Sequence, residues 1–228
     1  TPQAVFSTIV SGWPANEVLI KTVESINGLK NQQVSLKGTE LADTRFIRSL
    51  ELMRDLQSEG LIGLTAKQTE GAQPAYYITI ESKNVSEETL EKVLELKRVL
   101  KLDNDTEEYR LVFRAATASR KEIAVQTRSL LRILLIMAAQ IDVPDNHVTQ
   151  GRTLPNMEGD PEQKFINIRH SAARPLNAYV AVKYRGYWFW IDDRDIQSKS
   201  SFSFIISLFS LVEAGGKPTP PLITIPTQ

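Results

Sequence analysis

The segment from Tyr179 to Asp195 has the sequence YVAVKYRGYWFWIDDRD, and it decides the architecture of the second half of the chain. Val, Tyr, Phe and Trp are concentrated on both sides of Arg185 and Gly186, a pattern typical of two β-strands joined by a two-residue turn. Gly186 suits such a turn because glycine readily adopts a positive φ. We therefore expect a β-hairpin that is followed by an acidic cluster.

The aromatic residues of this hairpin are the candidate binding residues. Strand alternation places Tyr187 on one face and Trp188 and Trp190 on the other, so both faces carry large apolar area. We expect one face to meet helices. Because exposed paired Trp side chains favour aggregation, we expect the other face to be covered by the N-terminal half, by a second subunit or by a ligand. Intramolecular cover would make Trp190 a core residue, whereas Trp188, Trp190, Tyr187 and Arg185 would otherwise form a recognition surface.

The acidic cluster that follows the hairpin is the candidate metal site. Asp192, Asp193 and Asp195 are carboxylates at the end of a predicted strand, and such a group can bind a hard cation. The alternative is that they start a helix, where Asp residues cap the first turn and pair with neighbouring basic residues. We favour the helix start, and we expect no cofactor.

The composition excludes several kinds of chemistry. The chain has 228 residues, 27 Lys and Arg against 27 Asp and Glu, two His and no Cys. Balanced charge gives no global field that attracts a polyanion, so nucleic acid is disfavoured as a partner. The lack of Cys removes thiol catalysis and disulfides, and no P-loop, dinucleotide fingerprint, nucleophile elbow or HExxH helix occurs. An enzyme is therefore disfavoured.

The hydrophobic periodicity of the chain as a whole predicts an α+β protein. Two units read strand, strand, helix, and we expect both strand pairs to be hairpins that together build an antiparallel or mixed sheet covered by two helices. The units span Tyr109–Phe113, Ile123–Thr127 and Ser129–Ile141, and then Tyr179–Tyr184, Tyr187–Asp192 and Ser200–Val212. A more helical region precedes them, with helices expected at Asn16–Leu29, Thr44–Ser58 and Ser86–Leu102. Shorter strands are expected at Phe165–Arg169 and Leu222–Ile225. The domain prediction is 1–105 and 106–228, or one continuous domain.

One segment of the first half resembles part of a winged-helix DNA-binding domain. The helix from Phe46, its exit at Gly60 to Leu64 and the strand Tyr76 to Ile80 are similar to a recognition helix and a wing. The resemblance implies phosphate contacts by three arginines of the helix, Arg45, Arg48 and Arg54. Nearby carboxylates offset these charges, and the preceding segment is too short for the usual helix and turn.

Several stretches are similar to those of an uncharacterised family of bacterial proteins. The similar stretches are Glu24–Leu29, Thr127–Leu131, Ile141–Pro144 and Tyr184–Asp193 with Ser198–Lys199. The resemblance implies a bacterial source, and some members look like envelope lipoproteins whose signal and anchor cysteine would precede Thr1. Membrane attachment is therefore expected only through such an N-terminal anchor, because no apolar run reaches the ~20 residues that a membrane span needs. The resemblance implies no activity.

These observations favour a non-enzymatic binding or assembly module of a bacterium, with the envelope or periplasm favoured over the cytoplasm. A protein partner or self-association would then use the aromatic hairpin. The alternatives are a winged-helix DNA-binding regulator and a metal-assisted hydrolase.

Overall fold

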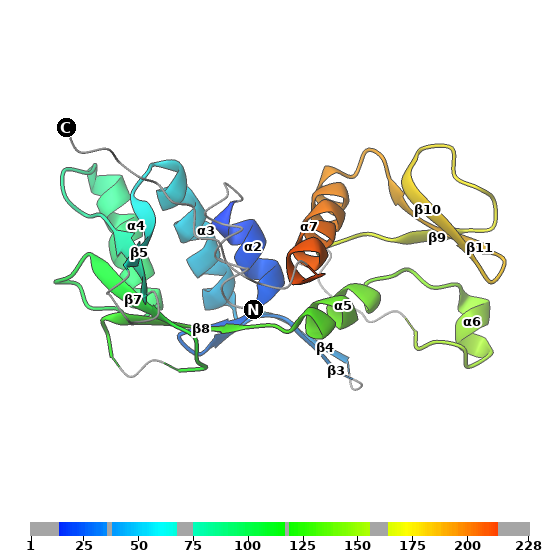
Figure 1. Cartoon of the computed structure of the whole chain (residues 1–228), viewed down its shortest axis with the longest axis horizontal. Helices are drawn as coiled ribbons and strands as arrows, with labels where there is room; N and C mark the ends of the chain where they lie inside the picture. The colour runs from blue at the N-terminus through cyan, green and yellow to red at the C-terminus, as the bar shows by residue number, and fades with distance from the viewer. Residues whose placement is uncertain (1–13, 36–37, 68–74, 117–118, 156–163, 214–228) are drawn as a thin grey trace.

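The structure is a computed structural model that describes residues 14–35, 38–67, 75–116, 119–155 and 164–213. Helices α2 to α4 belong to the N-terminal half, a six-stranded mixed sheet takes strands from both halves, and a three-stranded sheet follows near the C-terminal end. The α+β class predicted from the sequence is confirmed. Figure 1 shows the two sheets at opposite ends of the molecule, with α5 and α7 between them.

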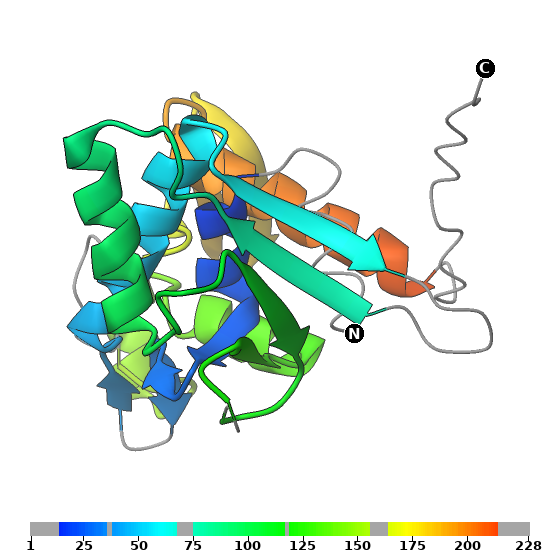
Figure 2. The same ribbon diagram turned by 90° about the vertical axis from the view of Figure 1, so that its left-hand side faces the viewer.

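The larger sheet has the strand order β2-β1-β8-β7-β6-β5. Its strands are β1 (Val23–Ile26), β2 (Leu29–Lys30), β5 (Ile62–Lys67), β6 (Ala75–Ile80), β7 (Glu108–Val112) and β8 (Glu122–Thr127). All neighbours are antiparallel except β7 and β8, which are parallel. Figure 2 shows β5 and β6 running side by side at one edge of the sheet. A separate two-stranded ribbon, β3 (Gln33–Ser35) with β4 (Gly38–Glu40), precedes α3.

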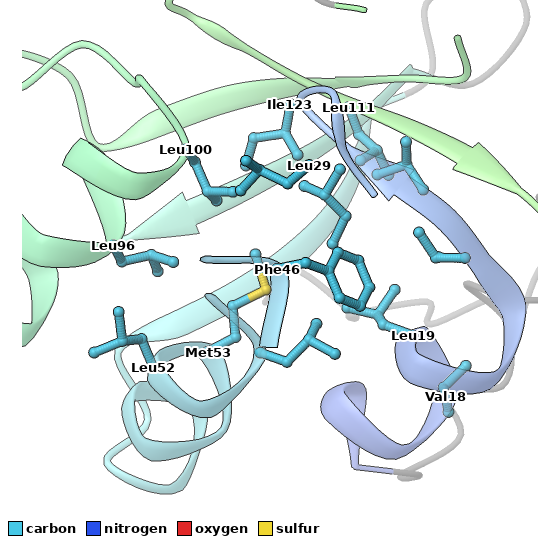
Figure 3. Close-up of a cluster of buried hydrophobic side chains, with 14 of the residues drawn as sticks. Val18, Leu19, Leu29, Phe46, Leu52, Met53, Leu96, Leu100, Leu111 and Ile123 are labelled. Atoms are coloured by element: carbon cyan, nitrogen blue, oxygen red, sulfur yellow. The ribbon is translucent and has the colours of Figure 1, made fainter. Parts of the chain in front are cut away.

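Three helices pack on this sheet: α2 (Ala15–Thr22), α3 (Thr44–Ser58) and α4 (Glu87–Val99). Helix α3 begins where the Asp43 side chain accepts a hydrogen bond from the Arg45 amide, and Gly60 with φ of 76° follows its end. Its apolar stripe is buried, and Phe46 points into the middle of the main core (Figure 3). Helix α4 follows its N-cap, Ser86, whose hydroxyl oxygen accepts a hydrogen bond from the Thr89 amide.

The smaller sheet has the order β10-β11-β9, formed by β9 (Arg169–Ser171), β10 (Ala178–Tyr184) and β11 (Tyr187–Asp192). Helices α5 (Leu130–Ala138), α6 (Asp145–Thr149) and α7 (Ile196–Glu213) accompany it. A second cluster of buried residues lies here: Ile136, Phe165, Ile166 and Ile191. Ile20 and Met137 pack against both clusters, so the two cores are continuous.

Two details of strand pairing differ from the sequence prediction. The first strand, strand, helix unit exists as β7, β8 and α5, but β7 and β8 are parallel, with Leu111 opposite Ile123, and do not form a hairpin. The second unit, β10, β11 and α7, lies in the other sheet, so the two units do not share one sheet. An alternating pattern identifies the face that a strand buries but carries no information on its direction or its neighbour. The six-stranded sheet takes strands from both sides of residue 105.

The first predicted helix is too long. Helix α2 ends at Thr22, and the β-branched residues Val23 and Ile26 belong to β1. Asn27 and Gly28, with φ of 47° and 81°, form the two-residue turn of the β1–β2 hairpin. The sequence prediction took this pair for a helix end, because Asn and Gly favour positive φ in both settings.

Further boundaries also differ. The strand expected at Phe165 to Arg169 is not regular there, since β9 starts at Arg169 and Phe165 is a buried core residue whose amide donates to Gln140 Oε1 over 2.9 Å. Helix α7 begins at Ile196, four residues before the predicted start at Ser200. The strand expected at Leu222–Ile225 lies outside the described residues.

Candidate functional site

The predicted hairpin forms the centre of the three-stranded sheet. Tyr184 and Tyr187 close it, and the turn residues Arg185 and Gly186 have φ of 48° and 89°, the two positive values of a type I′ turn. The positive φ predicted for Gly186 is confirmed. Strand β11 then pairs on its other side with β9, which places Phe189 opposite His170 and Trp190 opposite Arg169.

One face of this sheet carries Trp188 and Trp190, each beneath an arginine. The Arg174 guanidinium carbon lies 5.4 Å from the centre of the Trp188 ring, and that of Arg169 lies 5.6 Å from the Trp190 ring. These are cation–π distances, and both Trp side chains are partly buried and not fully enclosed. Cover of this face was expected from the N-terminal half, a second subunit or a ligand. In the structure, Arg169 of β9 and Arg174 of the β9–β10 loop cover part of it. Lys183, directly opposite Trp188 on β10, adds a third cation to this face.

The opposite face meets the rest of the molecule. Ile191 is buried in the second core cluster, while the Tyr187 ring contacts His147 and His170 edge to face, at 5.3 and 5.7 Å between ring centres. These are the only two histidines of the chain. Asp142 Oδ2 lies 2.9 Å from His170 Nδ1, which becomes an ion pair when the imidazole is protonated. The sequence placed both histidines in an irregular connection and gave no sign that they meet at Tyr187.

Strands β10 and β9 are the two edge strands of this sheet. Ile168, directly before β9, forms a β-bridge with Ile141, whereas β10 has no second partner among the described strands and is the open edge. It exposes Tyr179 to 43%, Val182 to 61% and Tyr184 to 56%. Because Tyr184 and Tyr187 close a two-residue turn, they are a hydrogen-bonded pair, and alternate residues of β10 direct their backbone groups away from β11. The N–H groups of Ala181 and Lys183 therefore face the open edge. A bulge between Ala178 and Val180 bends the start of the strand.

The basic residues around this edge have few acidic partners. Within the described part of the chain, Arg174, Lys183 and Arg185 form no ion pair, and Arg185 instead lies over the Tyr184 ring at 5.2 Å. Residues 164–199 contain seven Lys and Arg and three Asp, a net charge of +4 in a chain whose total is zero. The three-stranded sheet is therefore a locally basic region that also exposes aromatic side chains.

The acidic cluster has a structural role for each carboxylate. Asp192 lies 3.3 Å from Arg169 Nη1, and Asp193 lies 2.8 Å from Lys199 Nζ. Asp195 accepts hydrogen bonds from the Ser198 amide and hydroxyl at the start of α7. Burial raises the pKa of Asp195, but these hydrogen bonds outweigh it and hold the pKa below its usual value.

The three carboxylates therefore point to separate partners. Within the residues that the structure describes, no group of three acidic or histidine side chains is arranged to hold a metal ion. The structure gives no support to a cation site at this cluster.

Two of the arginines on which the winged-helix hypothesis depends, Arg45 and Arg48, form ion pairs with carboxylates. Arg45 pairs with Asp43 at 2.7 Å, and Arg48 pairs with Glu95 at 2.7 Å. The carboxylates raise the pKa of both arginines. The hairpin β5–β6, expected as a wing, belongs to the six-stranded sheet through its pairing with β7. These arginines would have to give up their ion pairs before they could contact phosphate.

The chain matches no protein-family model, no curated protein and no solved structure at a significant level. In the described ranges, no helix has both the length and the apolar character required to cross a bilayer.

Proposed function

We propose that the protein is a non-enzymatic binding module, and that its partner is a protein whose extended acidic segment pairs with the open edge of β10. The observation that carries the proposal is the combination found at this edge, where exposed aromatic side chains stand among cations that lack a carboxylate partner in the described structure.

Strand addition suits the geometry of β10. An extended segment that joins a sheet edge gains main-chain hydrogen bonds, and its alternate side chains contact the two faces of the sheet. The N–H groups of Ala181 and Lys183 supply donors for such bonds. On the two faces, Val182 and Tyr184 supply apolar contacts, while Lys183 supplies a charged one. Lys183 and the bulge also discourage indiscriminate edge pairing, so a partner needs complementary charge.

The positions of the arginines and the net charge of the chain favour an acidic peptide over single-stranded nucleic acid. Bases bind such sheets by stacking on aromatic rings, but guanidinium groups already lie over Trp188 and Trp190. A chain of zero net charge also lacks the long-range field that nucleic-acid binding uses. The DNA-binding alternative loses support because Arg45 and Arg48 are ion-paired. The hydrolase alternative has no metal-holding group among the described residues.

Intrinsic fluorescence tests the proposal, because two of the three Trp residues lie in the site. We expect a saturable change when a ten-residue peptide of alternating Glu and Val is added, and none with the matching peptide of Lys and Val. The variant Arg174→Ala with Lys183→Ala should lose the response. A matched control, Arg45→Ala with Arg48→Ala, removes two cations elsewhere and should keep it.

Two results would overturn the proposal. The first is an equal response of the site variant and the control variant, since binding would then not depend on the three-stranded sheet. The second is a fluorescence response to oligothymidine at 50 mM salt that exceeds the response to the acidic peptide. Such a result would identify single-stranded nucleic acid as the partner.

We further propose a bacterial envelope location. It is supported by the resemblance of Tyr184–Asp193 and the other quoted stretches to a family in which some members look like lipoproteins. The full-length precursor tests it, because a signal peptide ending in a lipidated Cys before Thr1 is expected. A precursor that lacks a signal peptide would contradict it.

A further inference from the structure

A recess of about 610 Å³ lies beside the C-terminal end of α4, in the part of the molecule built on the six-stranded sheet. Seven described residues line it, and they come from the helix, from the turn after it and from the segment before β8. They are Leu94, Lys97, Arg98, Lys101, Leu102, Asn104 and Arg120. Four of the seven are cationic, and none of these seven is acidic.

Lys97 is the buried one of the four cationic residues, with 1% of its surface exposed. Its ammonium group donates to the Asn104 carbonyl at 3.2 Å and to the Thr106 carbonyl at 3.0 Å. The ammonium also lies 5.9 Å from the centre of the Tyr109 ring, so the protein holds this charge in place beside the recess. Burial without a carboxylate in hydrogen-bonding contact is costly for a charged amine, and it lowers the pKa of Lys97.

The other three cations are exposed and come from different segments. Arg98 is in the last turn of α4, and Lys101 follows it with φ of 56°. Arg120 lies just before β8, where its guanidinium donates to the Leu102 carbonyl at 3.1 Å and its own carbonyl accepts from the Asp103 amide at 2.9 Å. These two hydrogen bonds hold Arg120 against the end of α4. Within the described residues, none of these three cations forms an ion pair.

A structural explanation covers only part of this arrangement. Basic side chains near the C-terminus of a helix complement its dipole, which accounts for Arg98, Lys97 and Lys101. Three carboxylates of the following loop, Asp103, Asp105 and Glu107, act on Lys97 electrostatically but do not line the recess. Arg120 belongs to neither the helix nor its turn, so the helix dipole does not explain why a fourth cation lines the same recess.

We infer that this recess binds a small phosphorylated ligand. Four cationic side chains around one recess suit the several oxygens of a phosphate or diphosphate group, and Arg in particular matches phosphate geometry with two donors at once. Leu94 and Leu102 provide an apolar side for the remainder of the ligand. The volume falls within the range of small-molecule sites and exceeds what a lone phosphate fills. The inference does not depend on the proposed function, because the recess and β10 belong to different sheets.

Inorganic pyrophosphate is the probe for a first test. A ligand that binds only the folded state raises the melting temperature with concentration. We expect pyrophosphate to raise it by several degrees at millimolar concentration, while sodium chloride of equal ionic strength does not. Calorimetry should give a Kd that is weakened at least tenfold in Arg98→Gln with Arg120→Gln. The control variant Arg152→Gln removes an exposed arginine that does not line the recess and should bind as the parent does.

A second variant keeps the test decisive if the double variant fails to fold. Lys101→Gln changes one exposed side chain and should weaken pyrophosphate binding by about threefold to tenfold while leaving the melting temperature of the free protein nearly unchanged. The inference is wrong if chloride and pyrophosphate act alike, or if the recess variants bind pyrophosphate as tightly as the parent protein.

Discussion

The two sheets of this molecule bury their apolar side chains to very different extents. Among the described residues, the cluster centred on the six-stranded sheet and α2 to α4 contains 24 buried residues, four of them from α5 and α7, whereas the cluster beside the three-stranded sheet contains four residues. Cations near α3 are paired with carboxylates, whereas Arg174, Lys183 and Arg185 near β10 have no carboxylate partner in the described part of the structure. The comparison indicates that stability resides at the first end, whereas the second end keeps apolar and charged groups available for contact.

The largest expected loss of stability comes from Phe46, an aromatic residue at the centre of the main core. Phe46 is fully buried in the main core, so Phe46→Ala should lower the free energy of unfolding by about 3–5 kcal/mol. Chemical denaturation measures this loss, and Phe46→Leu should recover most of it. A loss below about 1 kcal/mol would show that the six-stranded end is not the main source of stability.

A second prediction uses pH to probe the same end. Burial raises the pKa of Tyr109 to about 12, and the single proton of its hydroxyl is shared between the Asp103 and Thr106 carbonyl oxygens, which lie at 2.5 and 2.6 Å. The neutral form is favoured in the folded state, so this stabilisation is present below pH 10 and is lost as pH rises from 10 to 12, by roughly 2 kcal/mol.

Melting temperatures of the parent protein and Tyr109→Phe at pH 9 and pH 11 test this prediction. The parent should lose more stability than the variant over that interval. Equal losses would mean that Tyr109 does not ionise differently in the two states.

A third prediction concerns Trp190 of the smaller sheet. The sequence suggested a core residue whose loss unfolds the protein, but Trp190 is only partly buried and is covered by Arg169. We expect Trp190→Ala to cost about 1–2 kcal/mol, less than Phe46→Ala, because partial burial contributes less transfer free energy. Trp190→Phe is the conservative control. If Trp190→Ala instead matches Phe46→Ala in chemical denaturation, the contrast between the two ends fails.

The smallest expected effect comes from the two type I′ turns. Gly28 and Gly186 both have positive φ, and no atom lies within 4 Å of an added Cβ, so substitution introduces backbone strain without a steric clash. Each change to Ala should cost on the order of 1 kcal/mol. We expect Gly28→Ala to lower the global free energy of unfolding and Gly186→Ala to increase amide exchange only in β10 and β11. Identical exchange patterns would remove this distinction.

These turns also show how far the sequence could be interpreted. The turn at Arg185 and Gly186 was predictable because long β-rich segments flank it. The turn at Asn27 and Gly28 was not, because its strands have four and two residues and it is fixed by distant partners. Asn27 donates to the Leu100 carbonyl at 2.7 Å and accepts from the Ala124 amide at 2.6 Å.

The candidate site was predictable only in part, because some of its residues give local signals whereas others are brought in from distant strands. Aromatic residues 187 to 190 stand out in the sequence, but the cations over Trp188 and Trp190 come from β9 and its loop, and they depend on a strand register that the sequence does not give. Helix α3 was predicted with its observed bounds because its apolar stripe and the Gly60 that follows its end are both local signals.

Amide exchange at the open edge of β10 tests the central claim most directly. In the free protein, the amides of Ala181 and Lys183 should exchange quickly, while those of Val182 and Tyr184, which face β11, should be protected. Adding the acidic peptide should slow exchange at Ala181 and Lys183 at least tenfold, since strand addition gives these groups hydrogen-bond acceptors. If the peptide binds while both amides still exchange at their free rates, the partner does not pair with β10 and the claim is contradicted.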